Sequence, residues 1–378
     1  MVDKKLFRNF DYTLFITVLL IIAFGLVILS SATHVTMERG GDQFAYVKKQ
    51  TFSIILGFIA IITMLSINYR SLARYYRLLY VVNIGMLLAV KFIGKEAKGA
   101  QSWISLGFFN LQPSELAKII VIITFAAYLV KRQGELNTFR DILPSFLHIG
   151  IPMGLILLQP DLGTALVFTA ICFGMLFVAG ANPRVLLAVI LAGAVAVSGV
   201  LYGQLVLGWE KPLKEYQLKR LTIFVDPYQD PQKSGYHVIQ SQIAVGSGGL
   251  WGKGLYEGTQ NRLNFLPEQE TDFIFSVVGE ELGFAGVSAA LLLFFILVYR
   301  GVRIAAKARD MFGTLLATGI VSMITFHLLV NIGMTAGIMP ITGIPLPLFS
   351  YGGSSMLANL TAIGIMLNIH LRRQKLMF

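Results

Sequence analysis

The sequence predicts an all-α, polytopic membrane protein: a bundle of ten transmembrane helices with one large extracytoplasmic loop. Apolar residues make up 55% of the 378 residues and charged residues only 13%, with a mean hydropathy of +0.70. A soluble globular chain carries about 25% charged residues. Apolar runs of about 20 residues are long enough to cross a bilayer. Ten such runs lie near 12–32, 49–67, 76–94, 113–131, 143–159, 162–180, 184–207, 272–299, 311–338 and 347–371.

The basic residues indicate the orientation of the bundle. The net charge is +11. If both termini are cytoplasmic, more than half of the lysines and arginines fall in the inner loops and tails, for example at Arg70, Arg300 and Arg372. This bias is the positive-inside rule of membrane proteins. We therefore expect both termini in the cytoplasm, and we attribute the basic charge to topology rather than to a nucleic-acid partner.

Loop lengths predict how the chain is organised. Most loops are short, so consecutive helices should be antiparallel neighbours within a single domain, 1–378. The exception is 208–271, a polar segment on the outer side, with a short amphipathic helix expected around 232–246. The first run is too long to be a cleavable signal and is expected to be retained. The single cysteine, Cys172, excludes an intrachain disulfide, and no histidine pattern indicates a dedicated metal site.

Four of the helix starts expected on the outer side carry polar residues. Glu115 and Lys118 follow a proline, which is favoured in a first helical turn. Asp161 and Asp272 open the sixth and eighth runs, and a proline- and glycine-rich stretch, 345–355, opens the tenth. Helix N-termini favour anions, and irregular backbone at membrane depth is tolerated where it lines a cavity. The sequence therefore predicts an outward-facing cavity for an anionic ligand.

Each of these residues also has a purely structural interpretation. Glu115 and Lys118 are three residues apart on one helix face, so they can neutralise each other. Asp161 and Asp272 can each cap a helix. Capping is compatible with catalysis because it holds a carboxylate in one orientation. For Asp272 it is the weaker explanation, because two further glutamates crowd the same turn.

The remaining polar features are less specific. Glu280 and Glu281 lie about 12 Å further along their helix and are expected to be structural or relay groups. The glycine-rich segment 246–254 lacks the Walker spacing and reads as a turn-rich loop. Lys219 and Arg220 in the large loop fit either a clamp for a phosphate-bearing headgroup or a solvated face.

Long motifs in order along the chain resemble the SEDS family (shape, elongation, division and sporulation). They include GAQSWISLG at 99–107, FNLQPSELAK at 109–118, QPDLGT at 159–164, LPEQETDFIF at 266–275 and PITGIPLPLFSYGGSS at 340–355. The lead into the fourth of these motifs looks more like the elongation protein RodA than the division protein FtsW.

This resemblance implies a peptidoglycan glycosyltransferase that polymerises lipid II at the outer face of the bacterial cytoplasmic membrane. Asp272 matches the essential aspartate of the family, and Glu115, Lys118 and Asp161 match other functional positions. The further candidates for substrate binding are Lys219, Arg220, Gln240, Gln242 and Ser354. The implied partners are the nascent glycan, membrane lipids, a class B penicillin-binding protein and other proteins of the elongation complex.

The implied reaction inverts an α-linked sugar to a β-1,4 linkage, so one base is enough. We expect Asp272 to be that base for the acceptor hydroxyl. A divalent cation, Mg²⁺ or Mn²⁺, held by Glu115 or Asp161 with the pyrophosphate is a further expectation, and no organic cofactor is expected. The alternatives are a lipid II flippase or transporter, a scaffold for the penicillin-binding protein, or an FtsW-like division or sporulation paralogue.

Overall fold

The computed structural model describes residues 10–34, 44–97, 100–105, 107, 110–209, 215–231, 235–263 and 265–373. Among these residues, nine helices are long and apolar enough to cross a membrane, and α8 is a shorter apolar helix. The ten helices are α2 (Tyr12–Ala32), α3 (Ala45–Ser66), α5 (Tyr76–Ile93), α6 (Pro113–Val130), α7 (Phe139–Leu157), α8 (Leu162–Val178), α9 (Pro183–Leu205), α13 (Ile274–Ala306), α14 (Met311–Thr335) and α15 (Gly353–Leu371). Each predicted run overlaps one of them, so the polytopic all-α fold is confirmed.

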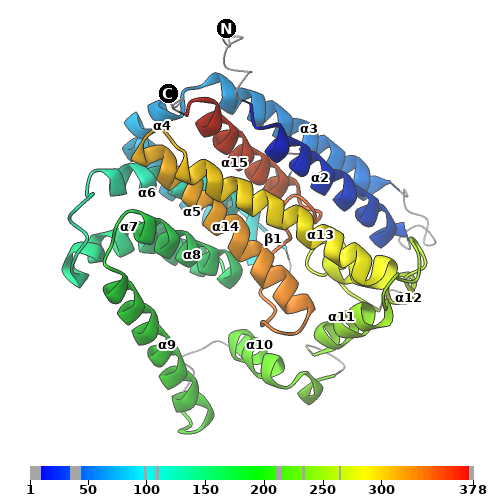
Figure 1. Cartoon of the computed structure of the whole chain (residues 1–378). Helices are drawn as coiled ribbons and strands as arrows, with labels where there is room; N and C mark the ends of the chain where they lie inside the picture. The colour runs from blue at the N-terminus through cyan, green and yellow to red at the C-terminus, as the bar shows by residue number, and fades with distance from the viewer. Residues whose placement is uncertain are drawn as a thin grey trace.

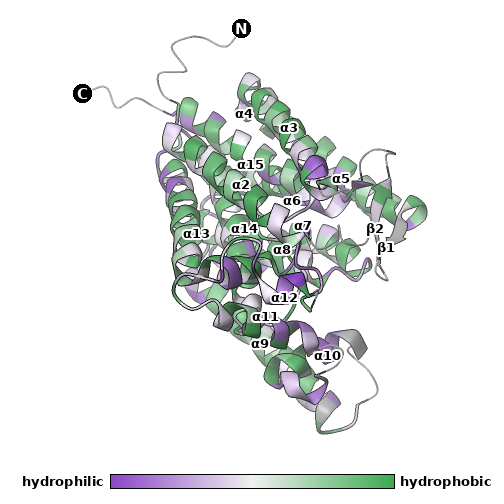
Figure 2. Cartoon of the chain, turned by 90° about the vertical axis from the view of Figure 1, so that its right-hand side faces the viewer, coloured by the Kyte–Doolittle hydropathy of each residue, from purple (hydrophilic) through white to green (hydrophobic). Residues whose placement is uncertain are grey.

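The centre of the bundle is built from α6, α14 and α15, which are the most buried of the spans. α15 packs against α3, and α14 packs against α13, α8 and α6 (Figure 1). α9 runs away from the other helices after α8 (Figure 1) and buries little of its surface. Its residues are apolar on all sides, as expected of a helix surrounded by lipid. Figure 2 shows hydrophobic residues along the long helices and hydrophilic ones around α10 and α12.

Two features depart from the sequence prediction. α13 continues to Ala306 instead of ending near 299. Arg300 does not end it, because its Nε donates to Oδ2 of the buried Asp11 at 3.1 Å. The segment after α5 forms a small antiparallel sheet of β1 (Lys95–Ala97), β2 (Ala100–Ser105) and β3 (Asn110–Leu111). β1 and β3, with three and two residues, are too short for an alternating sequence pattern to detect.

The large loop contains short helices rather than irregular chain. They are α10 (Glu215–Val225), the 3-10 turn η2 (Pro227–Gln229), α11 (Tyr236–Ser247) and α12 (Thr259–Arg262). Outside this loop, one more short helix, α4 (Tyr69–Arg74), joins α3 to α5. α11 confirms the helix expected around 232–246. It buries Val238, Ser241 and Ala244, which recur every three residues on the face that packs against α13.

The glycine-rich loop predicted at 246–254 docks on a break inside α13. Gly283 has φ 61° and ψ −158°, which interrupts the helical hydrogen bonds. The loop replaces them: the amides of Lys253 and Gly254 donate to the carbonyls of Glu280 and Glu281 at 3.0 and 2.9 Å. The amide of Phe284 donates in turn to the Gly249 carbonyl at 2.9 Å. The polar backbone groups exposed by the break are therefore satisfied within the protein.

We predict that Gly283→Ala destabilises the protein. Gly283 occupies a backbone region that is nearly closed to other residues, at a cost of about 1–3 kcal/mol. Its Cβ would also lie 2.3 Å from the Gly252 nitrogen. Thermal unfolding of the detergent-purified protein should show a lowered midpoint. Gly193→Ala in α9 is the matched control, because its Cβ meets nothing within 4 Å; equal stability of the two variants would contradict the prediction.

Candidate active site

The four polar segments that the sequence placed at helix starts line one cavity of about 340 Å³. Its wall is formed by the first turns of α6 and α8, the turn before α13, and the stretch from Thr342 to Ser355. Five of the predicted site residues line it: Glu115, Lys118, Asp161, Arg220 and Asp272. The cavity expected from the helix starts is therefore present.

Lys118 is held by two partners in the wall of the cavity. Its Nζ donates to Glu115 Oε1 at 2.8 Å and lies 3.0 Å from His327 Nε2, although its side chain is only 2% exposed. His327 Nδ1 lies 2.7 Å from the Met323 carbonyl. A carbonyl accepts only, so Nδ1 carries the proton and Nε2 accepts from the ammonium. Glu115 Oε2 is buried without a hydrogen-bond partner among the described residues.

His327 is the cavity residue that the sequence did not single out. It lies in the middle of α14, where a lone histidine on an apolar helix is most simply a packed core residue. The contact with Lys118 joins residues 209 positions apart, so no local spacing reveals it.

Asp161 caps α8, as its structural interpretation predicted. Oδ1 accepts from the Thr164 amide at 2.9 Å and Oδ2 from the Thr164 hydroxyl at 2.7 Å. Both oxygens are therefore engaged by the first turn of the helix. The carboxylate has a fixed orientation at the edge of the cavity.

Asp272 does not sit at a helix cap, which corrects the expectation that it opens the eighth helix. Phe273 occupies the N-cap position of α13 and makes no side-chain capping hydrogen bond. Asp272 belongs instead to a turn that begins at Glu268, whose φ is 55° and whose carbonyl accepts from the Asp272 amide at 3.1 Å. The helix is displaced because this tight turn uses the backbone before it.

Neighbouring elements fix the position of that turn. Asn331 of α14 donates through Nδ2 to the carbonyls of Asp272 at 3.0 Å and Ile344 at 2.8 Å. The Ser350 hydroxyl donates to the Thr271 carbonyl at 2.6 Å. A methyl group on Gly343 would lie 3.5 Å from Asp272 Oδ2. The irregular chain before α15 thus forms one face of the cavity opposite Asp272.

Other predicted binding residues lie elsewhere. The Ser354 hydroxyl accepts from the Gln112 amide and donates to the Asn110 carbonyl, both at 2.9 Å, so it ties α15 to β3 and α6 behind the cavity. Gln240 and Gln242 lie on α11, and within the described chain neither lines this cavity. Lys219 lines a neighbouring cavity, to which Arg220 also contributes.

Glu280 and Glu281 have the structural role expected of them. Glu280 Oε1 accepts from Lys253 Nζ at 2.7 Å and from the Thr259 hydroxyl at 3.0 Å. Glu281 Oε1 accepts from the Ser31 hydroxyl at 2.6 Å. Both are fully buried and secure the loop over the break in α13.

The residues do not form a preformed metal centre. In the part of the chain that the structure describes, no group of three His, Cys, Asp or Glu side chains is placed to hold a metal ion. The two expected ligands are already engaged, Glu115 by an ammonium and Asp161 by Thr164. Among the residues that the structure describes, a divalent cation therefore has no ready-made set of three protein ligands.

Comparisons with known proteins identify the family. A family model for the FtsW, RodA and SpoVE proteins, described as a cell cycle protein, matches residues 11–375. Stage V sporulation protein E of Bacillus subtilis (strain 168) is 38% identical over 363 residues, covering 95% of this chain and 96% of that one. Peptidoglycan glycosyltransferase MrdB of Escherichia coli (strain K12) is 36% identical over 378 residues, covering 99% and 98%.

A solved structure supports the same conclusion. It describes the structural coordination of polymerization and crosslinking by a peptidoglycan synthase complex. One of its chains is 35% identical, with a TM-score of 0.80 and coverage of 96% of this chain and 97% of that one.

We predict that Lys118→Met destabilises the protein by about 3–5 kcal/mol, because it leaves Glu115 as a buried, unpaired charge. The double variant Glu115→Gln with Lys118→Met removes both charges and should recover much of that loss. Thermal unfolding of the purified proteins measures the two effects. A double variant no more stable than Lys118→Met would show that the pair is not the source of the loss.

Proposed function

Because the chain belongs to the FtsW, RodA and SpoVE family, we propose that it is a peptidoglycan glycosyltransferase that polymerises lipid II into β-1,4 glycan strands. The observation that carries this proposal is the convergence of Asp272, the Lys118–Glu115 pair and two helix N-termini in one cavity. The positive-inside bias supports cytoplasmic termini and a cavity that opens to the outer face of the cytoplasmic membrane. Residues 1–378 are proposed to act as one domain, with 208–271 as its outer loop.

Asp272 is the proposed general base. The 4-hydroxyl oxygen of the acceptor sugar attacks C1 of the donor sugar, and the C1–O bond to pyrophosphate breaks with its electron pair on the departing oxygen. The hydroxyl proton passes to the Asp272 carboxylate. Attack opposite the leaving group converts the α-linkage to a β-linkage in one step. Such a base contributes about 10²–10⁴-fold to the rate.

Lys118 and Arg220 are the proposed stabilisers of the leaving group. Both line the cavity that holds Asp272, and so do the first turns of α6 and α8, whose positive dipole ends favour an anion. The contacts with Glu115 and His327 hold the ammonium in one place before substrate arrives. Preorganised charge of this kind costs no reorganisation during the reaction.

The cellular role is proposed to be rod elongation, on the RodA-like features of the 258–267 segment. The identities to a sporulation protein and to MrdB are nearly equal, so division or sporulation remains the alternative. A class B penicillin-binding protein is the proposed partner, supported by the related chain from a complex that couples polymerization to crosslinking. Other proteins of the elongation complex and membrane lipids are further proposed partners.

A divalent cation is proposed only as a companion of the substrate. Mg²⁺ usually binds through one or two carboxylates plus substrate phosphates. Of the two expected ligands, Glu115 has a buried carboxylate oxygen, Oε2, without a hydrogen-bond partner among the described residues. We predict that EDTA lowers the polymerisation rate without shifting the unfolding midpoint of the substrate-free protein, and that Mg²⁺ or Mn²⁺ restores the rate. A lowered midpoint in EDTA would instead indicate a resident structural metal.

We predict that Asp272→Asn abolishes polymerisation of lipid II by the purified protein, alone or with its penicillin-binding partner, while the unfolding midpoint stays near that of the wild type. The amide keeps the shape of the side chain but cannot take the proton. Gel electrophoresis of the glycan product measures the loss.

Glu257→Gln is the matched control, because Glu257 is exposed and pairs with Arg262. Full glycan synthesis by Asp272→Asn would refute the role as base. Movement of labelled lipid II across vesicles by a wild-type protein that makes no glycan would favour a flippase.

A further inference from the structure

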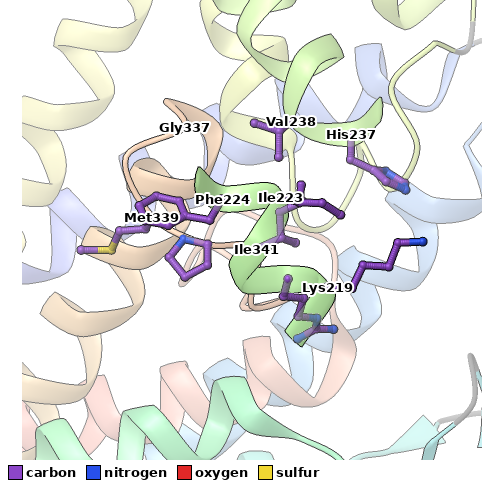
Figure 3. A pocket seen from close by; sticks show the side chains of 10 residues that line it. Lys219, Ile223, Phe224, His237, Val238, Gly337, Met339 and Ile341 are labelled. Atoms are coloured by element: carbon purple, nitrogen blue, oxygen red, sulfur yellow. The ribbon is translucent and has the colours of Figure 1, made fainter. Parts of the chain in front are cut away.

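A second cavity, of about 290 Å³, lies between α10, the start of α11 and the chain that follows α14. Figure 3 shows Lys219 and His237 on one side of it and Phe224 and Met339 on the other. Ile223 and Val238 add to its largely apolar lining. The cavity is therefore amphipathic, with polar nitrogen groups facing an apolar surface.

The polar side is formed by Lys219, Arg220 and His237. Lys219 Nζ lies 2.8 Å from Asp230 Oδ2, yet its side chain remains 42% exposed. His237 Nδ1 is buried and has no hydrogen-bond partner among the described residues. Burial lowers the pKa of His237, and the nearby Glu268 carboxylate opposes that shift.

This cavity adjoins the site of the proposed reaction. Arg220 lines both cavities, and its Nη1 lies 3.5 Å from the Thr342 carbonyl oxygen. The chain 337–341 lines the second cavity and 342–345 the first. The His237 ring stacks on Phe273, with centroids 6.1 Å apart, and Phe273 follows Asp272 directly.

We propose that the second cavity seats the pyrophosphate and first prenyl units of the acceptor lipid. The inference rests on the proposed function, in which both substrates carry a pyrophosphate on a prenyl chain. The pyrophosphate that departs needs Lys118 and the helix N-termini of the first cavity. The pyrophosphate that stays on the acceptor needs only cations and an apolar surface, which the second cavity supplies next to Asp272.

Lys219→Glu tests this proposal, with Arg262→Glu as the matched control. Both changes reverse a solvent-accessible cation, 42% exposed at Lys219 and 55% at Arg262, that pairs with a carboxylate in the same loop. Arg262, however, lines neither cavity among the described residues. Native mass spectrometry of the full-length protein in detergent counts bound undecaprenyl pyrophosphate. The wild type and Arg262→Glu should bind two equivalents, and Lys219→Glu should bind the second about tenfold more weakly or worse, the equivalent of 1.4 kcal/mol.

Further binding experiments distinguish which phosphate-bearing compound the second site selects. Phe224→Trp, on the apolar side, should also weaken the second equivalent, because it competes with the prenyl chain. Inorganic pyrophosphate or phosphatidylglycerol that occupies the second site as well as undecaprenyl pyrophosphate does would overturn the proposal, as would normal binding by Lys219→Glu. If Asp272→Asn is inactive while Lys219→Glu binds normally, this inference fails and the proposed function stands. Polymer synthesis by Asp272→Asn refutes the base assignment whatever the binding data show.

Discussion

The structure depends on one constraint: inside a bilayer, every backbone amide and carbonyl must find its partner within the protein. The long helices meet it by themselves. Where the chain leaves the helical path, other segments supply the partners. The glycine-rich loop bonds the break at Gly283, and Ser350 and the Tyr351 amide bond the turn at 268–273. Irregular backbone therefore occurs where packed segments surround it, and the cavity lies beside the second of these places, the turn at 268–273.

The same constraint governs charge. Lys118 is buried, so its ammonium is tolerable only with acceptors at hydrogen-bond distance, and Glu115 and His327 provide them. The arrangement places a positive charge in the wall of the cavity without leaving it unpaired. Structural pairing and a role toward an anionic ligand are thus not competing explanations for these residues. Pairing with Glu115 allows the Lys118 ammonium to be buried in the cavity wall. Because Lys118 lines the cavity, the same ammonium can interact with an anionic ligand.

What the sequence predicted was local. The helices follow from apolar runs, the Glu115–Lys118 pair from a spacing of three residues, and the Asp161 cap from its place before a helix. What it missed joins distant segments: His327 reaches Lys118 across the bundle, and Ser354 is used by β3 and α6. The misplacement of Asp272 at a helix cap has the same origin, because the turn from Glu268 is held by α14 and the chain before α15. Sequence spacing carries no record of such contacts, and the roles assigned to the site residues still rest on chemistry and resemblance.

Asn331, which is buried beside the cavity, shows that few side chains could hold the two irregular segments together. Its Nδ2 group has two N–H bonds, and the carbonyls of Asp272 and Ile344 accept both. An ionised aspartate of the same shape has no N–H and would place a negative charge against two carbonyl oxygens. A leucine would leave both carbonyls without this partner in a buried place. A side-chain amide therefore hydrogen-bonds both carbonyls at once. It also fixes the position of Asp272 relative to the opposite wall of the cavity. Because a misplacement of about 1 Å can cost a factor of 10² in rate, this contact links the folding constraint directly to the chemistry proposed for Asp272.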